Sequence, residues 1–218
     1  MKFTTLNTIV EDILKILKGS VINSSDPISK RQLEDWVHQY RAKLIAQDIN
    51  KRYYANPDYI QIIKDYPLEN THANDLWRTV NKLPKTIDLR FKSGITWLGN
   101  YATREEYTKV PQGREMFQAY KRYTSGSRIA FLEDGYVFVN NPDADITAVT
   151  IKGIFENPME VIRLANPDAD GSEPYPIPNS KVTTLKEMIL KGEFGIEVAA
   201  PIDVTDDSKH NPTQIITK

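Results

Sequence analysis

The spacing of apolar residues changes near residue 53, and this change limits most strongly how the chain can fold. In residues 5–18 apolar side chains recur every three or four positions, as the buried face of a helix requires, and Gly19 follows as a helix end. The same period returns after Ser29 and lasts to about residue 50. Its apolar members are Leu33, Trp36, Val37, Tyr40, Leu44 and Ile45. We therefore predict two amphipathic helices that pair as an antiparallel hairpin.

The second helix begins with a capping signature. Ser29 is placed to cap the helix, and Gln32, three residues later, can reach back to it. Ile28 and Leu33 flank this pair and are spaced as a hydrophobic staple. The pattern predicts that the helix starts directly after Ser29.

Strand patterns replace the helical period after residue 53. The β-branched residues Ile60, Ile62 and Ile63 predict one short strand. Residues 67–84 contain many loop-forming side chains, and we predict a loop there with one helical turn at 74–80. Residues 113–123 predict a short helix.

Two hairpins are predicted in the same region. Apolar alternation in residues 87–91 and again in 95–101 surrounds a Ser93-Gly94 turn. A second alternation over residues 128–140 surrounds Asp134-Gly135, a pair suited to the positive backbone angles of a tight turn. Residues 146–155 predict a third consecutive strand, which ends before Pro158.

The last third of the chain alternates between irregular and helical patterns. Four prolines between residues 166 and 179 predict an irregular crossing, because proline interrupts helices and central strands. A helix is predicted at 184–191, and an extended arm from residue 197 onward. An isolated terminal strand has little to stabilise it, so we expect the arm to lie on the sheet or on another subunit by strand addition.

These elements predict an α+β fold in which an N-terminal helical hairpin packs beside mostly antiparallel β-hairpins, followed by an extended C-terminal arm. The expected divisions are a helical region at 1–52, a β region at 53–165, and a crossing, helix and arm at 166–218. We expect one integrated domain plus the arm.

Composition excludes several classes of function. The chain has 218 residues and no cysteine, which removes disulfides, zinc ribbons and cysteine nucleophiles and favours a reducing compartment. Its 28 basic and 29 acidic side chains provide no concentrated basic surface for nucleic acid. No apolar run reaches the length of a membrane span, and the first residues lack a signal-peptide pattern, so we expect no membrane partner.

Catalytic signatures are absent from the sequence. It has no phosphate-binding loop and no nucleophile elbow. His38, His72 and His210 are expected on a helix, a loop and the terminal arm, in surface or capping roles. We predict no catalytic residue and no cofactor.

The string Asn-Pro-Asp-Ala-Asp occurs twice, at 141–145 and 166–170. Alternating carboxylates can bind a hard cation, which makes Asp143, Asp145, Asp168 and Asp170 weak metal candidates. No glutamate closes a calcium loop, and Asn-Pro-Asp by itself opens turns. We therefore favour a turn role for both strings.

Several short strings, together with the order of elements, resemble a known family. They are the helix start at 29–33, the strings at 78–85 and 94–99, the hairpin at 134–138 and the strand at 146–158. The chain resembles the head-to-tail adaptor, or connector, proteins of tailed bacteriophages, and most closely the neck and tail ring proteins of crAss-like phages. The resemblance covers most of residues 5–165.

This resemblance implies a structural virion protein without enzymatic activity. It implies a homo-oligomeric ring, usually of twelve copies, that sits below the portal, contacts neighbouring ring proteins, and extends the channel through which genomic DNA leaves. It also implies a location in the neck or tail of the virion after synthesis in the host cytoplasm. The large insertion at 53–125 and the acidic C-terminal stretch leave the ring layer and the partner open.

Candidate interface residues lie at both ends of the chain. Apolar residues occupy more than one face of the first helix, and we assign Ile9 and Ile16 to a subunit interface. In the arm the candidates are Ile202, Val204, Ile215 and Ile216. Residues 141–218 carry 7 basic and 13 acidic side chains, and we expect part of this acidity to face passing DNA.

Two alternatives remain open from the sequence alone. One is a metal-dependent phage enzyme acting on nucleic acid through the four aspartates. The other is a DNA-binding module that uses Lys30, Arg31, Arg41 and Lys43.

Overall fold

A computed structural model describes residues 4–19, 29–52, 54–73, 76–90, 93–101, 103–111, 113–114, 128–141 and 145–196. Helices come first along the described chain, eight strands follow and two helices come last, in the order α1 (Leu6–Gly19), α2 (Lys30–Arg52), η1 (Pro57–Tyr59), β1 (Gln61–Ala73), β2 (Leu76–Thr79), β3 (Ile95–Asn100), β4 (Glu105–Glu106), β5 (Thr108–Lys109), β6 (Ile129–Glu133), β7 (Tyr136–Asn140), β8 (Ala148–Gly153), α3 (Pro158–Ala165) and α4 (Asn179–Phe194). The predicted α+β class is confirmed.

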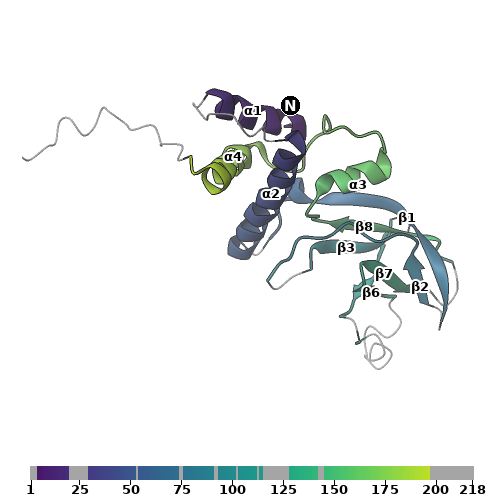
Figure 1. Cartoon of the computed structure of the whole chain (residues 1–218). Helices are drawn as coiled ribbons and strands as arrows, with labels where there is room; N and C mark the ends of the chain where they lie inside the picture. Colours follow the sequence, from purple (N-terminus) through teal and green to yellow (C-terminus); the bar gives the residue numbers. More distant parts are fainter. Residues whose placement is uncertain are drawn as a thin grey trace, which may run out of the picture.

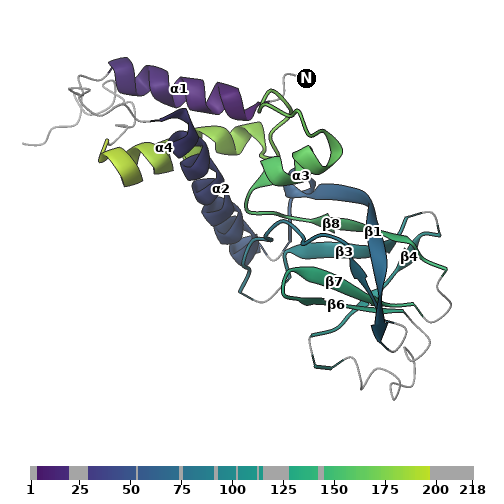
Figure 2. The same cartoon turned by 45° about the vertical axis from the view of Figure 1, so that its right-hand side comes forward.

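Three helices form the helical part of the molecule. Helices α1 and α4 lie side by side and α2 crosses them, while α3 lies between this group and the sheet (Figures 1 and 2). A single core joins α1, α2, α4 and the irregular crossing. Its fully buried side chains are Ile9, Val10, Ile13, Leu33, Val37, Leu185 and Ile189. The predicted two-helix hairpin is therefore completed by a third helix from the far end of the chain.

Both N-terminal helices begin at a side-chain cap, of which the one at Ser29 was predicted. Ser29 Oγ accepts a hydrogen bond from the backbone N–H of Gln32 at 3.1 Å, which confirms Ser29 as the cap of α2. Ile28, the other half of the predicted staple, lies outside the described residues. Thr5 caps α1 in the same way, because its Oγ1 accepts from the N–H of Thr8 at 3.2 Å.

The strands form one sheet in the order β4-β3-β8-β1-β2-β7-β6-β5. All its pairings are antiparallel except that of β5 with β6. Strands β4 and β5 are separated only by Tyr107, so one short segment pairs with β3 at its start and with β6 at its end. The sheet thereby curls into a small barrel, visible in Figure 2, whose interior contains Leu98, Tyr107, Ala130, Val139 and Ile151.

Strand β1 is longer than predicted because it changes partner along its length. Its first half pairs with β8 and its second half with β2. Asp65 has a φ of 50°, and the register shifts between Ile63 and Tyr66, as at a β-bulge. Pro67 follows this irregularity, near the point where β1 changes partner. The predicted loop over residues 67–84 and the helical turn at 74–80 are therefore wrong, because residues 61–73 and 76–79 are strands.

The predicted hairpin at 87–101 is also wrong. Residues 95–100 form β3, but residues 87–91 form no strand in the described part, where Thr86 makes one isolated bridge to Phe155. Ile87 is buried against Ile45 and Ile49 of α2, so its apolar side chain covers a helix rather than extending the sheet.

The β6–β7 hairpin is confirmed, with φ of 50° at Asp134 and 82° at Gly135. Strand β8 exists as predicted but is not adjacent to β7, because it inserts between β3 and β1. Helix α3 was not predicted, although Asn157 caps it by accepting from the N–H of Met159 at 3.0 Å and Pro158 stands at its first turn.

The predicted helix at 184–191 is the middle of α4, which starts at Asn179. The irregular crossing before it is confirmed as a segment without regular structure. The predicted helix at 113–123, apart from residues 113–114, and the arm from residue 197 onward lie outside the described residues. The division at 1–52, 53–165 and 166–218 stays a prediction, although α4 shares its core with α1 and α2.

Candidate functional site

A buried arginine connects the helical part to the barrel. Arg41 of α2 is completely buried. Its Nε donates to the carbonyl oxygen of Pro176 at 2.9 Å, and its Nη1 donates to that of Phe155 at 2.9 Å. Its guanidinium also lies over the ring of Tyr175, 5.5 Å from the centroid. One side chain therefore fixes α2, the end of the barrel and the irregular crossing to one another.

Arg41 is buried although no carboxylate among the described residues pairs with it. Burial lowers the pKa of Arg41 from its ordinary value, and Nη2 has no hydrogen-bond partner among the described residues. The carbonyl oxygens of Pro176 and Phe155 accept hydrogen bonds from the other nitrogens of the guanidinium, and the ring of Tyr175 lies against it. Arg41 was one of four residues of the alternative DNA-binding module. Its assignment there is wrong, because a buried side chain cannot contact DNA.

His38 lies one turn before Arg41 on α2 and is also buried. Its Nδ1 lies 2.8 Å from the hydroxyl oxygen of Tyr175. Burial first, then the nearby charge of Arg41, lowers the pKa of His38 from 6.5 to about 4, while Asp35 acts in the opposite direction. The imidazole is therefore neutral at pH 7, and the predicted surface role for His38 is wrong.

The structure describes the other two histidines less completely. His72 falls in strand β1 rather than in the predicted loop. His210 lies outside the described residues. Among the described residues, His38 is thus the histidine whose side-chain contacts are defined, and its contact with Tyr175 connects α2 to the irregular crossing.

A second polar joint holds α4 against α2. Asp48 of α2 is largely buried, and its Oδ2 accepts from the hydroxyl of Tyr59 at 3.0 Å. Its Oδ1 pairs with Nζ of Lys181 at 3.2 Å. The carboxylate therefore connects α2 to η1 and to α4, and sequence reasoning missed it because Asp48 appears as one more polar residue on an amphipathic helix.

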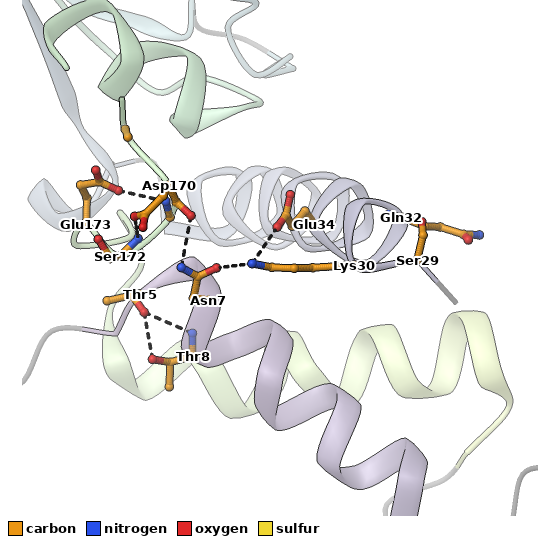
Figure 3. A network of polar contacts seen from close by, with 12 residues as sticks. Thr5, Asn7, Thr8, Ser29, Lys30, Gln32, Glu34, Asp170, Ser172 and Glu173 are labelled. Carbon is orange, nitrogen blue, oxygen red and sulfur yellow. Dashed lines mark hydrogen bonds and ion pairs between the residues drawn. The ribbon is translucent and has the colours of Figure 1, made fainter. Parts of the chain in front are cut away.

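The second Asn-Pro-Asp-Ala-Asp string is part of a polar network at the start of α1 (Figure 3). Nδ2 of Asn7 donates to the carbonyl oxygen of Asp170 at 3.2 Å, and Oδ1 of Asn7 accepts from Nζ of Lys30 at 2.9 Å. Asp170 Oδ1 accepts from the backbone N–H of Ser172 at 3.0 Å. The side-chain hydrogen bond with Ser172 first, and then this backbone bond, lowers the pKa of Asp170. The string therefore anchors α1, and Asp168 is exposed in the same turn.

The first string has a different set of partners beside the barrel. Asn141 is buried, and its amide donates to the carbonyl oxygen of Ile146 at 2.9 Å. Arg128 donates through Nη1 to Asn141 at 3.1 Å and through Nη2 to Asp145 at 2.8 Å. Asp143 lies outside the described residues.

The candidate metal ligands do not gather in the described part of the chain. Asp145 contacts Arg128 beside the barrel, whereas Asp170 contacts the helical part. Among the described residues, no group of three or more acidic or histidine side chains could hold a metal ion. Both strings have structural contacts, and the favoured turn role stays a prediction.

The predicted interface residues fall into three groups: one is buried, one is exposed, and the others lie outside the described residues. Ile9 is fully buried in the core shared with α2 and α4, so its side chain packs within its own chain. Ile16 is 41% exposed near the end of α1. Ile202, Val204, Ile215 and Ile216 lie outside the described residues.

Other exposed apolar side chains were not predicted as interface candidates. They are Tyr54, Ile62, Val80, Tyr101, Leu132 and Leu164. Exposure of large apolar groups on several elements is typical of proteins with partners, but single exposed residues also occur on monomers. In the described part of the chain, no helix combines the length and apolar character needed to span a membrane.

Comparison with known proteins identifies the family. No curated protein matches the chain. A family model described as phage tail ring protein 2, from the crAss ring group, matches residues 8–213. This match extends through the helical part, the barrel and most of the C-terminal stretch, and it confirms the family that the sequence resembles. The chain belongs to the phage tail ring protein 2 family of crAss-like phages.

Proposed function

We propose that this chain forms the head-to-tail adaptor ring that lies below the portal, extends the DNA channel and connects the capsid to the tail. Membership of a tail ring family implies a structural protein of the phage virion that assembles as an oligomeric ring. The match over residues 8–213 is the observation that carries the proposal. The position below the portal is the part that the proposal adds.

The joint around Arg41 supports a mechanical role. A ring subunit has to keep the surfaces that face its two neighbours at a fixed angle, and a buried side chain of one helix that contacts two other segments resists rotation between all three. Asp48 adds a second fixed connection between α2 and α4. The helical part and the barrel would therefore move as one unit within the ring.

The proposed interface uses apolar side chains near the two ends of the chain. Ile16 on α1 is available at the surface, and Ile202, Val204, Ile215 and Ile216 are the proposed contacts of the arm. Ile9 is left out of the proposed interface because its side chain is buried in the core.

The proposed ring has twelve copies, with the portal protein and adjacent ring proteins as partners. Genomic DNA would pass through its lumen without specific binding. The exposed Asp168 and Asp170 belong to the acidic C-terminal stretch, and like charge on the channel wall would keep DNA from adhering. A ring structure with these aspartates on its outer rim would contradict the charge assignment.

The proposal assigns no catalytic activity and no cofactor to the chain. Degradation of DNA by the purified chain with Mg²⁺, lost in an Asp168→Ala and Asp170→Ala double variant, would contradict it. Retained degradation in that variant would point instead to a contaminating nuclease.

Negative-stain electron microscopy of the chain mixed with the portal protein of the same phage tests the position of the ring. The proposal expects a ring coaxial with the portal on its tail-facing side. Deletion of residues 199–218 is expected to leave the monomer folded and to abolish incorporation. Portal particles that look the same with and without the chain would contradict the proposal.

A further inference from the structure

An apolar cavity of about 320 Å³ lies between β3 and the β6–β7 hairpin. Ile95 and Leu98 of β3 line one side of it, and Ala130, Leu132 and Val137 of the hairpin line the other. We call this feature, defined by these five residues, the barrel cavity. Concave apolar sites of this size with few polar groups are where proteins commonly bind small molecules.

Leu132 shows that the described side chains leave the barrel cavity open. Residues directly opposite in an antiparallel pair share a face, so Leu132 lies on the same face as Val137, and Ala130 on the same face as Val139. Ala130, Val137 and Val139 are at most 1% exposed, whereas Leu132 is 42% exposed. A leucine on the interior face of the barrel therefore still has apolar surface that a ligand can cover.

Lys109 lies on the same face as these apolar residues. It pairs in register with Ala130 in the parallel β5–β6 pair, so its side chain leaves the sheet on the side of Ala130 and Leu132. Its Nζ donates to the carbonyl oxygens of Ile95 at 3.2 Å and Thr96 at 2.8 Å. These two bonds hold the ammonium group beside β3, where Lys109 lines the barrel cavity.

The charge of Lys109 is not paired with a carboxylate among the described residues. Lys109 is also the one charged side chain among the described residues that line the barrel cavity. An ammonium group has three N–H donors, and the two carbonyl oxygens accept from two of them, so one remains for a further acceptor. Hydrogen bonds between oppositely charged groups are stronger than neutral ones, so an anionic acceptor suits this position best.

We propose that the barrel cavity binds a small amphipathic anion, whose apolar chain packs against Leu132 and Val137 and whose charged head accepts a hydrogen bond from Lys109. A volume of about 320 Å³ corresponds to the liquid volume of about ten water molecules. Octanoate, a medium-chain carboxylate with about ten non-hydrogen atoms, therefore matches the site in size as well as in charge. This inference goes beyond the proposed ring and does not depend on it.

Calorimetric titration of the full chain with octanoate at pH 7 tests the site. The inference expects saturable binding of one octanoate per chain. Burial of each CH₂ group raises affinity by up to about fourfold, so hexanoate should bind up to about fifteenfold more weakly, and acetate should show no binding. Absence of saturable octanoate binding, or equal affinities for octanoate and hexanoate, would overturn the inference.

Octylammonium separates the charge of the ligand from its apolar chain, because it has the same chain length and the opposite charge. The inference expects it to bind at least about threefold more weakly than octanoate, since an ion pair at a partly exposed site raises affinity by up to about fivefold. Equal or tighter binding of octylammonium would overturn the assignment of an anionic ligand.

Lys109→Gln tests the residue that gives this preference. The variant is expected to bind octanoate and octylammonium with similar affinity, and a preference for octanoate that persists in the folded variant would overturn the role of Lys109. Lys109 also bonds to β3, so the comparison of the two ligands on the unaltered chain tests the charge even if the variant does not fold.

Leu132→Trp tests the place of the apolar chain, because a larger side chain fills the barrel cavity. Leu132 is 42% exposed, so we expect the variant to fold and its affinity for octanoate to fall at least about tenfold. Leu164→Trp on α3, at a leucine that is 45% exposed, is the matched control and should bind octanoate normally. Unchanged binding by Leu132→Trp, or an equal loss in both variants, would overturn the inference.

A neighbouring cavity of about 390 Å³ shares Ile95 and Lys109 and is lined by Ile49 and Leu89 on the side of α2. Leu89→Trp narrows this second cavity and is expected to leave octanoate binding unchanged. Loss of binding in Leu89→Trp together with normal binding in Leu132→Trp would assign the ligand to the second cavity and overturn the inference.

Discussion

Nη1 of Arg41 donates to the carbonyl oxygen of Phe155 over 2.9 Å, and this bond joins the middle of α2 to the chain at the exit of the barrel. The same guanidinium holds Pro176 through Nε. The relative orientation of the two parts of the molecule therefore depends on one buried side chain.

Replacement of Arg41 by methionine is expected to lower the free energy of unfolding by about 3 kcal/mol. The variant fills much of the volume but leaves the two carbonyl oxygens without their donors, and bonds to charged groups contribute about 1.5–3 kcal/mol each. Urea denaturation followed by circular dichroism measures the change. Arg31→Met on the exposed side of the same helix is the matched control and should change stability by less than about 0.5 kcal/mol. Equal effects of both variants would contradict the role of Arg41.

His38 is expected to make stability depend on pH between about 6.5 and 4. Because burial lowers its pKa to about 4 in the folded chain, the unfolded chain binds the proton more tightly. The contribution of His38 to stability is therefore complete above pH 6.5, falls as pH drops through this window, and totals about 3 kcal/mol by the linkage relation.

The measurement is the free energy of unfolding against pH for the wild type and His38→Gln. Carboxylates, including Asp35, titrate in the lower part of the same window, so the difference between the two curves isolates His38. Glutamine does not titrate, and the difference should shrink as pH falls from 6.5 to 4. Parallel curves would show that His38 is not buried in its neutral form.

Gly99→Ala is expected to open the barrel between β3 and β4 and to destabilise the chain by about 2 kcal/mol. A Cβ at Gly99 would overlap the backbone carbonyl of Glu105 in β4, and a backbone group cannot rotate away as a side chain can. Thermal unfolding measures the loss. Thr96→Ser in the same strand is the control, and its midpoint should stay close to that of the wild type.

Ile16→Asp is expected to prevent ring formation while leaving the monomer folded. The side chain is 41% exposed, so its replacement should change monomer stability by less than about 0.5 kcal/mol, but a charge in an apolar contact would weaken association. Size-exclusion chromatography with light scattering, in the presence of the portal protein, reports the assembly. Ile16→Val keeps the apolar surface and should assemble normally. Normal assembly of Ile16→Asp would remove Ile16 from the interface.

Local patterns predicted the elements whose stability is local. The period of α1, the Ser29 cap of α2 and the Asp134-Gly135 turn each depend on residues close in sequence, and all three were correct. The order of strands was not predictable in this way. Strand β8 pairs with β1 and β3, which are distant in the sequence, and the residue pattern of 148–153 does not indicate which strands it pairs with.

Loop-forming residues misled the prediction for β1 because tertiary pairing outweighs local preference there. Pro67 lies just beyond the bulge in β1, and the strand continues through Asn70 and Thr71 to pair with β2. The joint around His38, Arg41 and Tyr175 was missed for a related reason. A histidine and an arginine on a helix suggest a solvated face, but the approach of Phe155 and of residues 175–176 buries them.

Native mass spectrometry of the full chain, alone and with the portal protein of the same phage, tests the adaptor ring most directly. The account predicts a monomer when the chain is alone and a closed complex with one discrete number of copies, twelve, when the portal is present. A chain that stays monomeric under both conditions would contradict it.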